Sequence, residues 1–448
     1  MNIFDGTNPE EIKFLEDLRG LIAKAYPRKD PTDILKRTIK FEDESILTTK
    51  IILRILKEDF GISLESTGMV NSLQVLNLGS LRLTHIPESI GNLPTLEVLF
   101  LDRNRLQNLP KSFENLKSLI GLDLDGNELV TFPEQILQLK SLKTLNLSMN
   151  RLISLPESLS TLESLNKLFL GYNKLTSLPV SMDNLKSIKL LSLPSNQISG
   201  LPESIGKLQS LQNFWLEKNK LTALPESFGS LQSLKYLDLR KNQLQTLPES
   251  FGNLKSLEWL ELSDNQLTTL PETFGSLKSL QKLILKNNKL LKLPHYFGNQ
   301  QSLKELILEN NQLSKLPESF GNLISLEKLT LMNNQLVSLP KTFGNLQTLQ
   351  ELSLEYNQIQ SLPETFTNLK SLQNLDLRGN KLTILPDSFG NLKSLQHLYL
   401  WENELVHLPE SLKELPSLET IWLMSNPLDS SAHKILEKLK ERNVEVII

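Results

Sequence analysis

The sequence of 448 residues contains no cysteine and only five histidines, and each shortage excludes a kind of chemistry. Without cysteine there is no thiol nucleophile, no thioester-forming ubiquitin ligase and no zinc site with cysteine ligands. The histidines form no His-Glu-x-x-His motif and no pair four residues apart, and no phosphate-binding glycine loop follows a strand pattern. We therefore predict no catalytic residue, no bound metal and no cofactor, and we expect that the protein is not an enzyme.

An excess of one charge and long apolar runs are also lacking. Lys and Arg total 48 against 51 Asp and Glu, a net charge of −3, so no overall basic character indicates a nucleic-acid binder. No apolar run approaches the ~18 residues that indicate a membrane span, and the first residues, Met1 to Asp5, lack the basic and apolar regions of a secretory signal. Proteins of oxidising compartments typically contain disulfides, and this chain has no cysteine to form one, so we expect a cytoplasmic protein. The lack of a long apolar run predicts that it does not insert into a membrane.

What the sequence has instead is a 23-residue repeat, present sixteen times between Leu73 and Leu428. The repeat reads L-x-x-L-x-L-x-x-N-x-L-x-x-L-P-x-x-F-G-x-L-x-S, with a clean copy from Leu257 to Ser279. This period and spacing are the signature of a leucine-rich-repeat solenoid, which grows by adding turns rather than by enlarging one core. We predict an α/β fold: a horseshoe with a concave parallel β-sheet, a helical N-terminal cap and a C-terminal capping helix.

The first half of each repeat predicts a short strand and a turn. In the copy above, Leu260 and Leu262 should point into the solenoid, while Trp259, Glu261 and Ser263 point outward. An asparagine follows the strand in fifteen copies, and its amide can pair the backbone groups that the turn leaves unpaired. Only the first repeat departs, with leucine at position 81. The asparagines are Asn104, Asn127, Asn150, Asn173, Asn196, Asn219, Asn242, Asn265, Asn288, Asn311, Asn334, Asn357, Asn380, Asn403 and Asn426.

The second half of each repeat should return along the convex side. Leu270-Pro271 begins this return, because proline ends the strand and fixes φ near −65°, and the short distance left predicts a 3₁₀ or one-turn helix. Phe274 and its equivalents should stack into an aromatic spine. The glycine after most of them suits a tight or left-handed turn. The equivalents are Phe113, Phe228, Phe251, Phe297, Phe320, Phe343, Phe366 and Phe389.

Both ends of the chain depart from the repeat. Residues 1–72 should form a helical cap over the first repeat, opened by the helix-start pattern at Asn8-Pro9-Glu10-Glu11. Within this segment, Arg37-Thr38-Ile39-Lys40-Phe41 resembles a docking motif for phosphatase-1-type catalytic subunits, although Ile39 and Phe41 also fit a cap core. We thus predict three segments: the cap, the repeats over 73–428, and a capping helix and strand over 429–448. Asp429-Ser430 should cap the start of that helix.

Candidate functional residues collect on the outward strand positions. All four tryptophans and four of the six tyrosines lie there. Protein interface centres are enriched in Trp, Tyr and Arg, whereas the structural alternative is that aromatics merely fill an exposed sheet, because they favour strands. One group is Phe169, Tyr172, Trp215, Tyr236 and Trp259, and the other is Tyr356, Tyr399, Trp401 and Trp422.

Charges on the same positions come in blocks. Lys218, Arg240 and Lys241 form a basic stretch beside the first aromatic group, and glutamates such as Glu351 and Glu355 make the later repeats acidic. These blocks fit an extended, charge-complementary protein partner, although exposed charges also serve solubility alone. We predict that Trp215, Tyr236 and Trp259 anchor a protein partner. The basic stretch should steer an acidic surface of that partner toward them. The alternative is a glycan or small-ligand binding module that uses the aromatic ladder.

Residues 73–428, about four-fifths of the chain, resemble the intracellular leucine-rich-repeat family. The 23-residue L-x-x-L-P-x-x-F/I-x-x-L form is similar to the Ras-group class, which includes the plant intracellular Ras-group-related proteins and the animal scaffold that joins a Ras-family GTPase to a phosphatase. This resemblance implies a cytoplasmic scaffold whose concave face holds a protein, such as a small GTPase or another signalling protein. Pathogen ligase effectors carry similar repeats, but their catalytic domains need the cysteine that this chain lacks.

Overall fold

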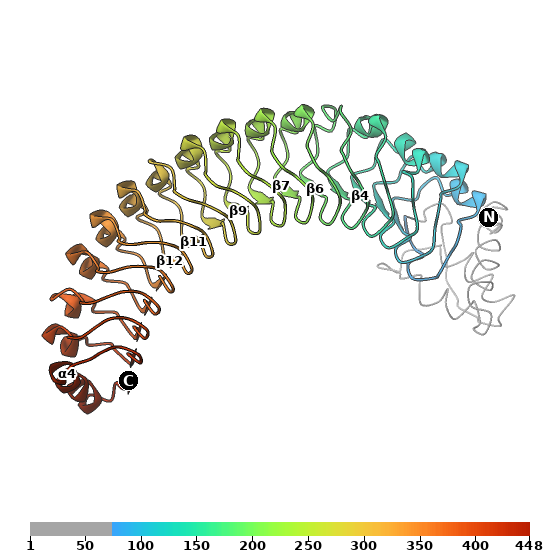
Figure 1. The fold of residues 1–448 in the computed structure, drawn as a ribbon. Coiled ribbons are helices and arrows are strands. Elements are labelled where there is room, and N and C mark those ends of the chain that lie inside the picture. The colour runs from blue at the N-terminus through green and yellow to red at the C-terminus, as the bar shows by residue number, and fades with distance from the viewer. Residues whose placement is uncertain (1–73) are drawn as a thin grey trace, which may run out of the picture. The chain divides into compact units, whose positions relative to one another are not determined.

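The structure is a computed structural model that describes residues 74–448. The expected helical cap over 1–72 and the Arg37–Phe41 motif lie outside the described residues. The described part of the chain falls into two compact units, one ending at Phe214 and the other beginning at Trp215. Within each unit the strands lie on one side of the chain and short helices lie on the other (Figure 1).

The first unit is a parallel ladder of short strands. Its neighbouring strands pair with a register shift of 23 residues, as in Leu76 opposite Leu99 and Leu122 opposite Leu145. The strands are β1 (Val75–Asn77), β2 (Val98–Phe100), β3 (Gly121–Asp123), β4 (Thr144–Asn146), β5 (Lys167–Phe169) and β6 (Leu190–Ser192), and β7 (Asn213–Trp215) crosses the boundary. The 3₁₀ helices are η1 (Glu88–Asn92), η2 (Lys111–Asn115), η3 (Glu134–Gln138), η4 (Glu157–Thr161) and η5 (Glu203–Lys207).

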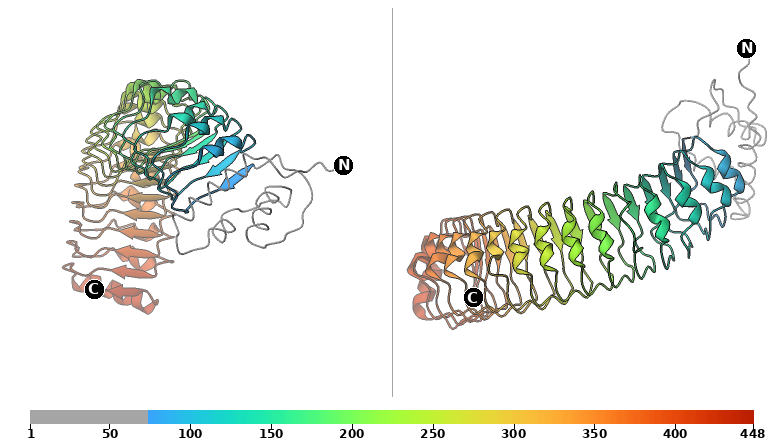
Figure 2. Two further views of the ribbon diagram at one scale, coloured as in Figure 1. Left: turned by 90° about the vertical axis from the view of Figure 1, so that its right-hand side faces the viewer. Right: turned by 90° about the horizontal axis from the view of Figure 1, so that it is seen from above.

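The second unit repeats this arrangement, and Figure 2 shows its strands stacked beside one another. Its strands are β8 (Tyr236–Asp238), β9 (Trp259–Glu261), β10 (Lys282–Ile284), β11 (Glu305–Ile307), β12 (Lys328–Thr330), β13 (Glu351–Ser353), β14 (Asn374–Asp376), β15 (His397–Tyr399), β16 (Thr420–Trp422) and β17 (Glu445–Ile447). Its 3₁₀ helices are η6 (Glu226–Ser230), η7 (Glu249–Asn253), η8 (Glu272–Ser276), η9 (Phe297–Asn299), η10 (Glu318–Asn322), η11 (Lys341–Asn345), η12 (Glu364–Asn368), η13 (Phe389–Asn391) and η14 (Glu410–Glu414).

The alternation within each strand is as the sequence predicts. Leu260 and Leu262 are fully buried, whereas Trp259 faces outward and is half-buried. Glu261 and Ser263 occupy outward strand positions as well, yet little of either is exposed. Polar side chains on the outer face of the strands are therefore more enclosed than the alternation alone would suggest.

The asparagine turn is confirmed. Asn265 is buried, its Oδ1 accepts a hydrogen bond from the backbone N–H of Leu244 (3.1 Å), and its Nδ2 donates to the carbonyl oxygens of Leu239 (2.9 Å) and Leu262 (3.0 Å). Leu239 belongs to the preceding repeat, so each asparagine joins two turns of the solenoid. In the first repeat Leu81 is buried, and its N–H donates to Asn104 of the second repeat.

The residue before each of the fifteen asparagines has a positive φ between 50° and 64°. An L-residue pays about 1–2 kcal/mol in this region, and only glycine adopts it freely. Glycine occupies the position only at Gly126 and Gly379, and elsewhere bulky residues such as Met149, Tyr172 and Tyr356 adopt it. The sequence pattern alone does not reveal this left-handed position.

The phenylalanine spine is confirmed from Phe228 to Phe366, whereas Phe113 lies between repeats that carry Ile90 and Ile136 at its position. The expected left-handed turn at the glycine that follows most of these rings is wrong. Rings from Phe228 to Phe366 stack nearly parallel, with centroids of successive rings 6.0–6.3 Å apart. The following glycines do not have a left-handed φ. A Cβ on Gly252 would lie 2.2 Å from the carbonyl oxygen of Thr273 in the next repeat. At Gly252 the next repeat therefore approaches too closely for a side chain, whereas the equivalent position of η12 holds Thr367.

One repeat departs from this packing. Gln300 takes the place of a leucine and is fully buried. Its Nε2 donates to the carbonyl oxygen of Phe274 (2.9 Å), while its Oε1 is buried without a hydrogen-bond partner.

The chain after the last repeat forms α4 (Ser430–Glu441) and then β17, which pairs in parallel with β16. The side chain of Asp429 accepts a hydrogen bond from the N–H of Ala432 (2.9 Å), so it caps the helix as the sequence predicts. This bond, with one from Ser431, lowers the pKa of Asp429 to about 2. Buried Ile435, Leu436 and Leu439 face the last repeat.

Candidate functional site

The first candidate surface, called here the tryptophan patch, consists of Trp215, Tyr236 and Trp259 at the start of the second unit. Tyr236 and Trp259 are direct partners on neighbouring strands. Trp215 and Tyr236 are 36% and 42% exposed, although the strand leucines on the opposite side are fully buried. Large aromatic side chains left open on a rigid sheet are typical of interaction surfaces.

The charges at this patch are less free than the sequence suggests. Arg240 Nε lies 3.2 Å from Asp238 Oδ2, and its Nη2 lies 3.9 Å from Glu217 Oε1. Part of the expected basic stretch is therefore neutralised within the chain. Lys218 and Lys241 are exposed and form no ion pair among the described residues. They are the cations of the patch that remain available to a partner.

Largely buried carboxylates lie beside the patch on the same outward face of the strands. Burial raises the pKa of Asp238 to about 6, and the neighbouring carboxylates Glu217 and Glu261 also raise it, against the opposing hydrogen bond and charge of Arg240. Glu217 Oε2 is buried without a hydrogen-bond partner. Unsatisfied buried groups are uncommon in folded proteins and accompany functional sites. The strand face here is therefore not optimised for stability alone.

A second aromatic group, called here the aromatic cluster, consists of Tyr399, Trp401 and Trp422. The ring of Trp422 packs edge-on against Tyr399 (5.2 Å between centroids) and Trp401 (5.8 Å). The guanidinium of Arg378 lies 5.4 Å from the Trp401 ring, within cation–π range. The indole N–H groups of Trp401 and Trp422 are buried and have no acceptor among the described residues.

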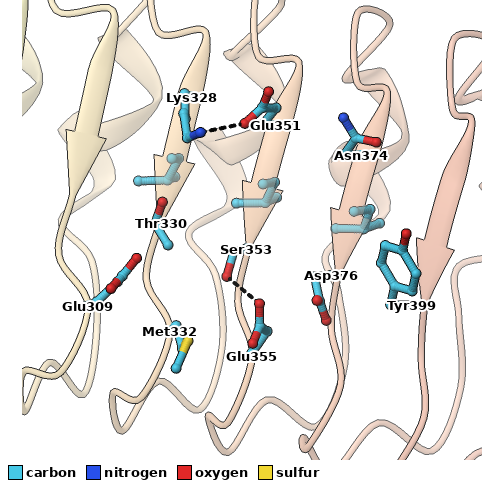
Figure 3. Close-up of a pocket in the computed structure, with 13 residues that line it drawn as sticks. Glu309, Lys328, Thr330, Met332, Glu351, Ser353, Glu355, Asn374, Asp376 and Tyr399 are labelled. Carbon is cyan, nitrogen blue, oxygen red and sulfur yellow. Dashed lines mark hydrogen bonds and ion pairs between the residues drawn. The ribbon is translucent and has the colours of Figure 1, made fainter.

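Beside this cluster a pocket of about 340 Å³ opens on β12–β15 (Figure 3). Asp376 is one of the residues that line the pocket. Burial, and next the nearby Glu355, raise the pKa of this carboxyl to about 7, against the opposing hydrogen bond and charge of Arg378. The side chains that line the pocket include Glu309, Lys328, Thr330, Met332, Glu351, Ser353, Glu355, Asn374, Asp376 and Tyr399.

The two surfaces share one arrangement that sequence reasoning missed. In each, an arginine bridges the aspartate two residues before it and a glutamate one repeat earlier: Glu217–Asp238–Arg240 and Glu355–Asp376–Arg378. The signal was present as Leu-Asp-Leu-Arg, which occurs at 237–240 and again six repeats later at 375–378. A glutamate 23 residues before each arginine completes it.

The remaining predicted residues do not join these surfaces. Phe169 and Tyr172 belong to the first unit, where Tyr172 is 52% exposed and Phe169 is half-buried between Asn146 and Ser192 of the neighbouring strands. Tyr356 lies against Gly379 of the next repeat, since a Cβ on Gly379 would meet its ring at 2.4 Å.

Another feature that sequence reasoning missed is a polar ladder. The side chains of Asp264, Asn287, Asn310 and Asn333, one per repeat, hydrogen-bond in series at 2.6–2.8 Å. Within residues 74–448, no group of His, Asp or Glu side chains could hold a metal ion. None of the helices in the same span is both long and apolar enough to cross a lipid bilayer.

Family models match most of the repeated region. A model described as leucine-rich repeat region matches residues 227–310 and 343–444, and one described as leucine rich repeat matches segments from 71 to 244. Among solved structures, a leucine-rich-repeat protein of Leptospira interrogans is 36% identical, with a TM-score of 0.71, over 84% of this chain and 96% of that one. The chain belongs to the leucine-rich-repeat family.

Two further structures are similar. The plant peptide hormone receptor RGFR1, in complex with RGF2, is 30% identical over 82% of this chain and 70% of the receptor chain, with a TM-score of 0.61. An internalin of Listeria monocytogenes is 25% identical over 69% of this chain and 88% of that one, with a TM-score of 0.57. No curated protein matches the chain.

Proposed function

We propose that the chain is a non-enzymatic scaffold that binds a protein partner on its strand face, with the tryptophan patch as the anchor. The observation that carries this proposal is the exposure of Trp215 and Tyr236 beside Trp259, on strands whose opposite faces are fully buried. Rigid aromatics contribute large contact area at little entropic cost, and truncating such anchors typically costs about 2 kcal/mol or more of binding free energy.

The charges around the patch favour a partner with an acidic surface. Lys218 and Lys241 flank the aromatics and are exposed, so they would attract carboxylates during the encounter. A small GTPase or another signalling protein is the partner class that the 23-residue repeat form implies. The RGFR1 structure supports protein binding more generally, since that receptor is in complex with RGF2.

The experiment is a pull-down that compares the wild type with Trp215→Ala/Trp259→Ala. Tyr296→Ala serves as the matched control, because Tyr296 precedes η9 on the helix side and is 57% exposed. Proteins retained by the wild type and the control but lost from the double variant would support the proposal, provided that all three melt at similar temperatures.

Equal retention by all three, with equal stability, would refute the tryptophan patch as the anchor. Binding to an array of purified glycans, removed by the double variant and without any retained protein, would favour the glycan alternative. The absence of cysteine supports a cytoplasmic location, which fractionation of the source cells would test.

A further inference from the structure

The pocket lies wholly within the second unit and is lined from β12–β15 and by Glu309, which follows β11 (Figure 3). Its volume of about 340 Å³ is at the small end for ligand pockets, which range from roughly 300 to 1,000 Å³. A pocket of this size on a flat sheet has room for one long side chain of a partner rather than for a whole loop.

Negative charge predominates among its walls. Four carboxylates, Glu309, Glu351, Glu355 and Asp376, line the pocket, against the single ammonium group of Lys328. The ion pairs around it leave carboxylate oxygens available: Lys328 contacts Oε2 of Glu351 (2.8 Å), and Lys286 contacts Oε2 of Glu309 (2.5 Å). No described residue bonds to the Oε1 atom of either glutamate.

The carboxylates of Glu355 and Asp376 share one cationic partner, Arg378, and Ser353 Oγ also donates a hydrogen bond to Glu355 Oε1 (3.2 Å) (Figure 3). Arg378 Nη2 lies 2.7 Å from Glu355 Oε2, and its Nε lies 3.2 Å from Asp376 Oδ2. Burial and the neighbouring Glu355 still keep the pKa of Asp376 near 7, so this one cation does not fully compensate the two carboxylates. A second positive charge entering the pocket would reduce their repulsion.

The pocket also offers apolar contact at one end. The ring of Tyr399 on β15 lines this end and packs against Trp422 of the aromatic cluster, while Met332 after β12 lines the opposite side (Figure 3). The unpaired indole N–H groups of Trp401 and Trp422 show that this corner of the face is not arranged for the stability of the free chain. Long basic side chains suit such a site, because their alkyl stems pack on apolar groups while the charged head reaches the carboxylates.

We propose that this pocket receives an arginine side chain from an extended segment of the partner protein. The guanidinium would lie between Glu351 and Asp376, and its stem would lie against the ring of Tyr399. Glu309, on the opposite side of the pocket, would add negative charge without touching it. Arginine fits better than lysine, because its planar fork can bond two carboxylates at once and stack on an aromatic ring. The inference rests on the proposed protein binding by the strand face, and it identifies a second contact point of opposite charge preference to the tryptophan patch.

The test uses the full chain and a small probe, Nα-acetylarginine methylamide, with the citrulline compound of the same shape as its uncharged counterpart. Ligand-detected NMR measures binding at millimolar concentration. We expect the arginine probe to bind and the citrulline probe to bind at least tenfold more weakly. The Glu309→Gln/Glu351→Gln variant should bind the arginine probe at least fivefold more weakly than the wild type does. The affinity of the wild type for this probe should fall as the salt concentration rises.

The matched control is Glu249→Gln/Glu414→Gln, which removes the same charge from the helix side at η7 and η14 and should leave probe binding unchanged. Equal binding of both probes, no binding of the arginine probe, or equal affinity in the Glu309→Gln/Glu351→Gln variant would overturn the inference. A third probe, Nα-acetylglutamate methylamide, tests for the opposite charge preference. Tighter binding of this probe than of the arginine probe would assign the pocket to an anion at Lys328 and would also overturn the inference.

This experiment needs no partner, so its failure is separable from failure of the proposed function. A pull-down that depends on Trp215 and Trp259, together with no arginine binding, would leave the scaffold intact and refute only the pocket. Arginine binding together with an unaffected pull-down would refute the tryptophan patch and leave the pocket as the contact point.

Discussion

Replacement of Asn265 by alanine should lower the free energy of unfolding of the second unit, by an amount that follows from the hydrogen bonds of this side chain. The backbone N–H of Leu244 loses its acceptor, Asn265 Oδ1, and a buried unpaired donor costs about 1–3 kcal/mol. Two further bonds, to the carbonyl oxygens of Leu239 and Leu262, are lost at a net cost of about 0.5–1.5 kcal/mol each. The longer contact of the same Nδ2 with the carbonyl oxygen of Ser263 (3.3 Å) shares these two hydrogens and is lost with them. Both carbonyls keep a second donor, from Asn242 and Asn288 respectively, so neither is left unpaired.

The expected loss is therefore roughly 2–6 kcal/mol. Because a repeat protein can unfold in parts, the assay combines urea unfolding with hydrogen exchange of the segment 239–268, which reports local opening. Asn265→Asp keeps the shape of the side chain but replaces its donors with an acceptor, so at neutral pH it should destabilise at least as much. A loss below about 0.5 kcal/mol for Asn265→Ala, with the Leu244 amide still protected, would refute this account of the asparagine turn.

Three other predictions concern the second unit. Gly379→Ala should cost about 1–2 kcal/mol for its left-handed φ of 64° plus the clash with Tyr356, and the loss should shrink in a Tyr356→Ala background; equal losses by urea unfolding would contradict this. Gln300→Leu should raise stability by roughly 1 kcal/mol, because it removes the buried unpaired Oε1, and a lower urea midpoint would show that the bond to Phe274 outweighs it. Because the folded chain raises the pKa of Asp376 from 3.8 to about 7, it holds this proton more tightly than the unfolded chain does, so the stability that the group contributes is lost as pH rises through that interval. Asp376→Asn should therefore make the melting temperature decline less steeply between pH 3.8 and about 7. The same pH profile in the variant and the wild type would contradict this role of Asp376.

The sequence was sufficient for features that repeat in side-chain type. The strand leucines, the asparagine turn, the phenylalanine spine and the cap at Asp429 each need a particular side chain in a particular place, so the pattern of residues records them. The left-handed position is different. This position requires a positive φ but no particular side chain, so residues as unlike as Met149, Lys218 and Asn310 occupy it. The sequence therefore shows no residue pattern that would predict it.

The candidate site was only partly predictable for a related reason. Outward placement of Trp215, Tyr236 and Trp259 follows from strand alternation. Whether a charge there is free depends on which side chain lies one repeat away and which rotamer it takes. The sequence therefore predicts a free cation at Arg240, whereas the structure pairs it with Asp238 and Glu217. The pocket depends on four strands at once, and no local pattern indicates its depth.

Because neighbouring strands are offset by one 23-residue repeat, the number of repeats between two residues of the second unit sets the distance between them. Removal or duplication of one whole repeat between Arg240 and Arg378 would change the separation of their two carboxylate–arginine groups by one strand spacing, about 4.8 Å, while every asparagine and phenylalanine keeps a neighbour of its own kind. An insertion of any other length would break that match. Unequal recombination among such similar units can therefore adjust the distance between two contact points in fixed steps, which gives this architecture a simple route to partners of different size.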